Sequence, residues 1–391
     1  PKYAYYVGWF MTTIYTPALC AMLAFFSSMM FLQLFNIPAI DFSTGQVNFA
    51  AIGVGAGFLM LGFGVNALSP KLAGKLQVGM TVIKLIPLIL RGVVGTIAGL
   101  INGTTLDVLN YVNTPAYTPV DGSGFFKAIV GFTFAYEGWI LATSINSELK
   151  DSKKNLPRAL IIGCCVTIVI YALYIWAMSS VGDVETIKQT WPFGESLPRI
   201  AFSKLFGGAV GTIVYVFITI SCLGTMNGLI MACCRNMYSV SARGMGPRPE
   251  FYGYIDEQNN FSIKSAVLGM MSAGFWYAWT VALWMGGPGL FGQIHSCEWL
   301  AWEPDEIGII CLYLMYIPMM VGLMVKAKEL GFVKRFILPG LGVLCCLFFC
   351  YAIWIGYGWK QCVGFLVFFA IVMALGWLIE YIRRKQDAAQ A

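Results

Sequence analysis

The chain has 391 residues, of which 58% are hydrophobic and 11% are charged, and its formal net charge is +6. Soluble domains carry roughly 25% charged residues, so this chain has too little polar surface to form a globule in water. The composition therefore excludes the soluble classes and indicates a protein of the lipid bilayer. The sequence contains a single histidine, His295, and neither a CxxC nor an HExxH pattern, so it predicts no metal site.

Ten apolar runs are long enough to cross the membrane, since a hydrocarbon core of about 30 Å takes roughly 20 residues of helix. The expected spans are approximately 5–35, 49–68, 78–101, 125–147, 158–181, 205–235, 265–286, 307–325, 336–356 and 361–381. We expect residues 1–391 to form one all-α transmembrane unit with an outer loop at 101–124 and a cytoplasmic loop at 241–262. Because the chain starts on Pro1, close to the first span, we also expect sequence upstream of it.

Three packing features are expected within these spans. The first and sixth runs reach about 30 residues, or some 45 Å as helix, so they stand out as the two long spans. Gly53, Gly55 and Gly57 in the second span contain a GxxxG spacing that permits close helix contact. We interpret three adjacent cysteine pairs as small buried hydrophobic residues; they are Cys164/Cys165, Cys233/Cys234 and Cys345/Cys346.

Orientation is predicted by the distribution of lysine and arginine over the alternating loops. Eighteen of the 25 basic residues fall on one set of loops and five on the other, while Lys84 and Arg91 lie within the third span. The richer set is expected to be cytoplasmic, which places both termini in the cytoplasm of a plasma-membrane protein. Topology thereby explains the net positive charge, and no nucleic-acid partner is predicted.

The fourth span carries a carboxylate inside an apolar run, in the stretch FTFAYEGWILATSINSELKDSKKNLPRA at 132–159. Glu137 and Gly138 interrupt the run near mid-membrane, where a carboxylate costs about 2.5–3.5 kcal/mol on insertion scales. Gly138 allows the backbone to leave helical geometry, and a broken helix exposes N–H and C=O groups that many transporters use to bind charged substrates. The alternative is that Glu137 caps a half-helix or pairs with a basic residue.

Three stretches resemble, in the same order, amino acid permeases of the amino acid–polyamine–organocation (APC) superfamily. The stretch LQVGMTVIKLIPLI resembles the family's fifth helix; FAYEGW, followed by ELKDSKKNLPRA, resembles its sixth helix and next loop; GTMNGLIMACCRNMYSVSARGMGPRP resembles its eighth helix. The resemblance covers essentially the whole chain and assigns its spans to family helices three to twelve, so the first two helices are expected to be missing. It implies an inverted-repeat (LeuT-type) transmembrane helical bundle and a secondary active amino acid transporter that works by alternating access.

The resemblance also implies a substrate site at the helix break. Phe134 matches the family's aromatic gate, for which ordinary helix packing is the alternative. The segment of Ala135, Tyr136, Glu137 and Gly138 matches the unwound loop, whose carbonyls hold the substrate's amino group. Glu137 lies where the family varies, so a role in carrying a proton is a weaker expectation.

Three further polar residues within spans have two interpretations each. Asn227 either reaches the substrate site or bonds to a neighbouring helix. Lys84, seven residues after Gln77, either snorkels to the interface or, as the resemblance implies, fills the place that sodium takes in sodium-coupled relatives. The second interpretation predicts sodium-independent transport, with protons as candidate coupling ions. Arg91 either snorkels outward, which we favour, or adds positive charge to an outer vestibule.

Other functional classes remain as alternatives. A channel would need a repeated polar stripe along several helices, and a membrane-embedded enzyme would need a convergent set of catalytic groups. The sequence shows neither pattern, so we expect no catalytic residues and no cofactor. Transport of polyamines or other amines is a further alternative. The residues leave the transported amino acid, the coupling mode and the oligomeric state open.

Overall fold

The computed structural model describes residues 2–41, 46–113, 122–142, 149–179, 197–256, 261–285 and 296–390. Within these ranges ten helical segments are long and apolar enough to cross a membrane, which confirms the predicted all-α bundle. The chain is therefore an integral membrane protein. Two strands of two residues each, β1 (Ile40–Asp41) and β2 (Gln46–Val47), pair between the first two spans.

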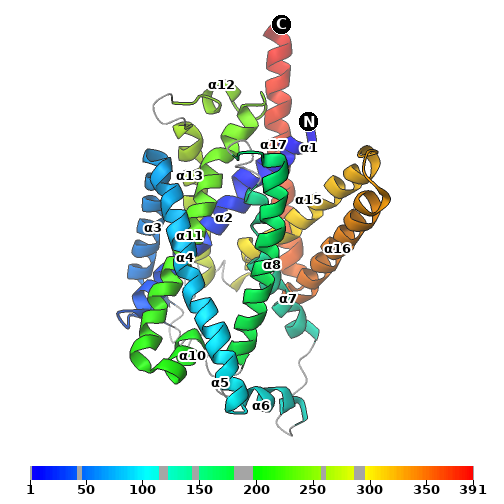
Figure 1. Ribbon diagram of the computed structural model, residues 1–391. Helices are drawn as coiled ribbons and strands as arrows, with labels where there is room; N and C mark the ends of the chain where they lie inside the picture. Colours follow the sequence, from blue (N-terminus) through cyan, green and yellow to red (C-terminus); the bar gives the residue numbers. More distant parts are fainter. Residues whose placement is uncertain are drawn as a thin grey trace.

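Figure 1 shows how the helices are arranged. They are, in chain order, α1 (Lys2–Phe10), η1 (Met11–Tyr15), α2 (Thr16–Gln33), α3 (Phe49–Leu68), α4 (Pro70–Leu90), η2 (Arg91–Gly95), α5 (Thr96–Ile101), α6 (Thr104–Asn110), η3 (Tyr111–Asn113), α7 (Gly122–Tyr136), α8 (Ser152–Ser179), α10 (Leu197–Phe206), α11 (Gly208–Ser241), α12 (Pro249–Tyr252), α13 (Ile263–Trp284), α15 (Pro304–Lys326), η5 (Val333–Ile337), α16 (Leu338–Tyr357) and α17 (Trp359–Gln390). The elements η1, η2 and η5 are single π-helical turns inside spans.

Three spans, not two, are exceptionally long. The first (Lys2–Gln33, 32 residues) and sixth (Gly208–Ser241, 34 residues) are long as predicted, but the third (Pro70–Ile101) also has 32 residues. The third was expected to begin at residue 78, where the apolar run starts. The helix instead begins at Pro70, because proline favours the first helical turn and polar residues can extend a helix beyond the apolar segment.

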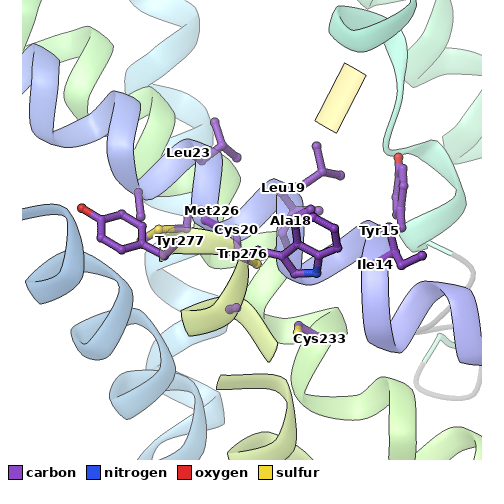
Figure 2. Packing of buried hydrophobic residues seen from close by; sticks show 14 of the residues in the cluster. Ile14, Tyr15, Ala18, Leu19, Cys20, Leu23, Met226, Cys233, Trp276 and Tyr277 are labelled. Atoms are coloured by element: carbon purple, nitrogen blue, oxygen red, sulfur yellow. The ribbon is translucent and has the colours of Figure 1, made fainter. Parts of the chain in front are cut away.

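Helix α2 lies at the centre of the bundle, packed against α11, α13 and α3. Thirteen of its 18 residues are buried, as expected for a helix that is apolar on every side. Figure 2 shows its side chains meeting Met226 and Cys233 of α11 and Trp276 and Tyr277 of α13. By contrast, α15 and α16 form a pair that leans away from this core (Figure 1).

Proline explains the π-turn that leads into α2. Pro17 has no N–H, so the carbonyl of Thr13, four residues earlier, lacks its usual helical donor. The indole Nε1 of Trp276 donates to this carbonyl at 2.8 Å, and the hydroxyl of Ser272 donates to it at 3.3 Å. Asn236 of α11 similarly donates to the carbonyl of Met11 at 3.1 Å. Side chains of α11 and α13 therefore stabilise the irregular turn, and π-turns of this kind are frequent at functional sites.

Two of the packing expectations were wrong in detail. The close contacts of α3 are at Gly55, where an added Cβ would lie 2.2 Å from the hydroxyl of Tyr277, and at Gly62, where it would lie 2.5 Å from the Ile230 side chain. Gly53 and Gly57 face open space. The GxxxG pair therefore lies on the helix face opposite the one that α13 covers. Cys233 and Cys234 are buried as predicted, but three cysteines of the other pairs are exposed on apolar helix surfaces; they are Cys164, Cys165 and Cys345.

Candidate functional site

The fourth span is broken at the predicted place. Helix α7 ends at Tyr136, and Gly138 has a φ of +107°, a region that favours glycine. The backbone N–H of Glu137 donates to the Phe134 carbonyl at 3.2 Å, and that of Leu141 donates to the Gly138 carbonyl at 3.0 Å. These short i to i−3 bonds replace the α-helical pattern, which confirms that the Glu-Gly pair interrupts the helix.

Glu137 lies among tyrosine side chains. The hydroxyl of Tyr316 on α15 donates to its Oε1 at 3.3 Å, while Oε2 is buried and has no hydrogen-bond partner among the described residues. Tyr313 of α15 and Tyr15 of η1 also interact electrostatically with the carboxylate. The Tyr15 hydroxyl points out of the buried cluster toward the chain around the end of α7, which is drawn in pale teal (Figure 2). No ion pair joins Glu137 to lysine or arginine in the described part of the chain, which disfavours the structural-pairing alternative.

A cavity of 440 Å³ lies beside the break, between α7, α15 and α16. Its walls are mainly aromatic and sulfur-containing side chains, together with Thr133. Tyr316 lines this cavity as well as bonding to Glu137, and its ring lies 5.4 Å from that of Trp139, which follows Gly138. The broken backbone, the carboxylate and an aromatic cavity are therefore joined through one tyrosine.

Comparison with known proteins shows which family this chain belongs to. A model of amino acid permeases matches residues 1–379. The chain belongs to the amino acid permease family. The serine/threonine exchanger SteT of Bacillus subtilis (strain 168) is 27% identical over 249 residues, covering 63% of this chain and 52% of SteT.

Two further relatives are also transporters. The aspartate-proton symporter of B. subtilis (strain 168) is 25% identical over 291 residues, covering 72% of this chain and 52% of the symporter. The human cystine/glutamate transporter is 25% identical over 189 residues, covering 47% of this chain and 35% of the transporter. The chain thus spans about half, or less, of the length of these curated relatives.

The other expected loop residues of the permease differ in their surroundings. Phe134 is half-buried and packs against the main core. Ala135 is exposed, and the ring of Tyr136 lies 5.1 Å from that of Tyr171 on α8 while also lining the cavity. Tyr136 and Glu137 therefore point toward different neighbours, and a role for Phe134 as a gate stays a prediction.

The side chain of Asn227 forms hydrogen bonds to two neighbouring helices. Its Oδ1 accepts from Nδ2 of Asn66 at 2.8 Å, and its Nδ2 donates to Oε1 of Gln77 at 3.0 Å and to the Ala73 carbonyl at 3.1 Å. This amide cluster joins α3, α4 and α11 within the permease. Of the two interpretations of Asn227, the structure supports bonding to a neighbouring helix. Lys84, two turns after Gln77 on α4, interacts with Cys222 of α11 and so lies along the same α4–α11 contact.

Arg91 does not snorkel, so the favoured interpretation was wrong. It is 2% exposed, and its Nη2 donates to the carbonyl of Ala177 at 2.8 Å. That carbonyl belongs to the last turn of α8, where helix carbonyls lack intrahelical donors and the helix dipole attracts positive charge. Arg91 therefore bonds the π-turn η2 to the end of α8.

Sequence reasoning missed the tyrosines around the carboxylate. Tyr15, Tyr313 and Tyr316 are each separated from Glu137 by many residues, and no local sequence pattern links them to it. One signal could have found them, because a buried tyrosine hydroxyl usually needs a hydrogen-bond partner. A tyrosine in mid-span therefore marks a candidate partner for a carboxylate in mid-span.

Proposed function

We propose that this permease is a secondary active amino acid transporter that works by alternating access, with its substrate bound at the break after Tyr136. The observation that carries the proposal is the half-buried Glu137 at the break, whose Oε2 is buried and has no hydrogen-bond partner among the described residues. Its family membership and the transport functions named for its relatives support the same conclusion.

The site suits the charged end of an amino acid. Carbonyls in the last turn of a helix lack intrahelical donors, and those before Glu137 can accept hydrogen bonds from an ammonium group. Glu137 adds negative charge close to these carbonyls, which attracts a cation in a medium of low dielectric constant. The adjoining aromatic cavity offers room for a substrate side chain. In this proposal Phe134 serves as the gate and Ala135 to Gly138 contact the substrate.

Transport is tested by counterflow in proteoliposomes that contain the complete protein. Vesicles loaded with an unlabelled amino acid should accumulate the labelled compound, and Glu137→Gln should reduce this accumulation at least tenfold. Glu329→Gln, in the α15–η5 connection and outside the site, is the matched control and should transport normally. Accumulation of labelled polyamines but of no amino acid would replace the proposed substrate class.

Lys84 supports the proposal that transport is not coupled to sodium. A fixed ammonium opposes a sodium ion about 4 Å away by roughly 4 kcal/mol at an effective dielectric constant of 20. We therefore expect equal uptake in sodium and choline buffers at one pH, and a proton gradient is the candidate driving force. A strict sodium requirement in the unmutated protein would contradict the assignment of Lys84.

The proposed location is the plasma membrane with both termini cytoplasmic, on the basis of the lysine and arginine distribution. An impermeant thiol reagent applied outside whole cells should label Cys297. In a Cys297→Ser background, a cysteine introduced by Gly331→Cys should not be labelled from outside. The opposite labelling pattern would reverse the topology.

A further inference from the structure

A second cavity lies far from the helix break, between α1 and α17 at the end of the bundle where the chain begins. Its volume is 180 Å³, and two basic residues, Lys2 and Arg384, form part of its wall. Figure 1 shows the start of α1 beside α17, whose C-terminal part continues beyond the other helices. The same wall includes Tyr6, Trp377 and Tyr381.

Hydrogen bonds hold the two helices that form the cavity. The Tyr5 hydroxyl donates to the Gly376 carbonyl at 2.8 Å, and Trp9 Nε1 donates to the Val372 carbonyl at 2.9 Å. An added Cβ at Gly376 would lie 2.7 Å from the Trp9 ring, so only glycine permits this approach. The cavity is therefore built on a close and specific helix contact.

The acidic residue in the cavity, Glu380, already accepts several hydrogen bonds from within the protein. Glu380 is buried and accepts from Arg383 Nη2 at 3.0 Å, from Arg384 Nε at 2.8 Å and from the backbone N–H of Gly246 at 3.0 Å. The terminal amino groups of Arg384 remain for another acceptor, since only its Nε is used in this contact. Lys2 forms no ion pair within the described ranges. The cavity thus offers two cationic donors.

Aromatic residues indicate that the cavity lies at the edge of the bilayer. The rings of Trp377 and Tyr381 stack with centroids 5.5 Å apart, and both side chains are more than half exposed. Exposed tryptophan and tyrosine at the end of an apolar span are typical of the membrane–water interface. A molecule bound here would contact water through its charged end and the hydrocarbon through its apolar end.

We propose that this cavity binds the phosphate group of an anionic lipid headgroup. Lysine and arginine are the usual partners of phosphate oxygens, and arginine presents several N–H donors in one plane. The exposed rings on α17 would then lie against the glycerol and upper acyl chains. Basic pockets between helices at an interface recognise anionic headgroups in this way.

The test uses the complete protein in nanodiscs of phosphatidylcholine with increasing phosphatidylglycerol, with lipid retention measured by native mass spectrometry. We expect selective retention of phosphatidylglycerol and about fivefold weaker retention for each charge removed by Lys2→Gln or Arg384→Gln. Lys385→Gln removes the same charge one residue away but outside the cavity lining, and it should retain the lipid. Equal losses in Lys385→Gln and Arg384→Gln would show general charge attraction and overturn the proposal.

Two controls separate a lipid site from other outcomes. Lys2→Gln leaves the bonds of Glu380 to Arg383 and Arg384 intact, so we expect the melting temperature of this variant in phosphatidylcholine to be unchanged. Inorganic phosphate and glycerol phosphate should not displace the bound lipid at millimolar concentration, because they lack the acyl chains. Displacement by either compound would assign the cavity to soluble phosphate and overturn the lipid assignment.

Discussion

The hydroxyl group of Tyr316 donates a hydrogen bond to Oε1 of Glu137 at 3.3 Å, and this bond joins α15 to the broken end of α7. The two residues are far apart in the sequence and belong to different spans. Tyr316 also lines the aromatic cavity, so the contact links the carboxylate to a residue of the cavity wall. The broken end of α7 and the tyrosine that contacts it therefore place a polar pair inside an apolar bundle.

Replacing Tyr316 with phenylalanine removes the donor and keeps the ring. A hydrogen bond to a charged group contributes about 1.5–3 kcal/mol, so we expect transport by Tyr316→Phe to fall by roughly tenfold or more. Initial uptake rates in proteoliposomes measure the effect. Tyr351→Phe, on the exposed side of α16, is the control and should transport normally. Unchanged uptake by Tyr316→Phe would remove this bond from the transport mechanism.

Replacing Gly138 with leucine should abolish transport without preventing membrane insertion. The φ of +107° is unfavourable for any residue with a Cβ, at a cost on the order of 1–3 kcal/mol, so the break must rearrange. Gly131→Leu is the matched control, since Gly131 lies in α7, has open space around it and lacks a positive φ. Uptake and surface expression are compared for both variants; full transport by Gly138→Leu would show that the loop geometry is dispensable.

Replacing Trp276 with phenylalanine should destabilise the protein. The change removes the 2.8 Å bond to the Thr13 carbonyl, which Pro17 leaves without a helical donor, and only the longer bond from Ser272 remains. A buried acceptor that loses its partner costs about 1–3 kcal/mol. Thermal unfolding in detergent should show a lower melting temperature than for the exposed control Trp354→Phe. Equal melting temperatures would mean that Ser272 or water alone can satisfy the Thr13 carbonyl.

Replacing Asn227 with leucine tests the amide cluster. Its bonds to Asn66, Gln77 and the Ala73 carbonyl are lost, and hydrogen bonds between membrane helices contribute about 0.6 kcal/mol on average. We expect a loss of about 1–2 kcal/mol in unfolding free energy with little change in the substrate concentration at half-maximal uptake. A large change in apparent substrate affinity at unchanged stability would instead place Asn227 in the substrate site.

Glu303 predicts a pH dependence of stability. Burial, together with the negative charge of Glu306, raises the pKa of Glu303 to about 7 from its ordinary value of 4.5. The folded protein therefore holds the Glu303 proton more tightly than the unfolded chain, and stability from this group is lost as pH rises from about 4.5 through 7.

Melting temperatures across this range measure the effect. Glu303→Gln should flatten the decline, whereas Glu298→Gln, an exposed partner of Lys360, should leave it unchanged. An unaltered decline in Glu303→Gln would assign the dependence to another group.

Local chemistry explains which features were predictable. Apolar runs of sufficient length predict spans because every backbone group must be satisfied inside the membrane, and helices satisfy their own. The break at Glu137 and Gly138 was equally local, since glycine and a carboxylate disfavour a continuous apolar helix. The start of the third span at Pro70 was missed because a helix can extend into polar sequence.

The sequence by itself determined the membrane class, the ten helical spans, the family resemblance and the position of the helix break. Only the tertiary structure decided that Tyr316 reaches Glu137, that Asn227 bonds to Gln77, and that Arg91 is buried against the end of α8. The physical reason is that a helix satisfies its backbone locally, whereas its polar side chains are satisfied by whichever helix packs against them.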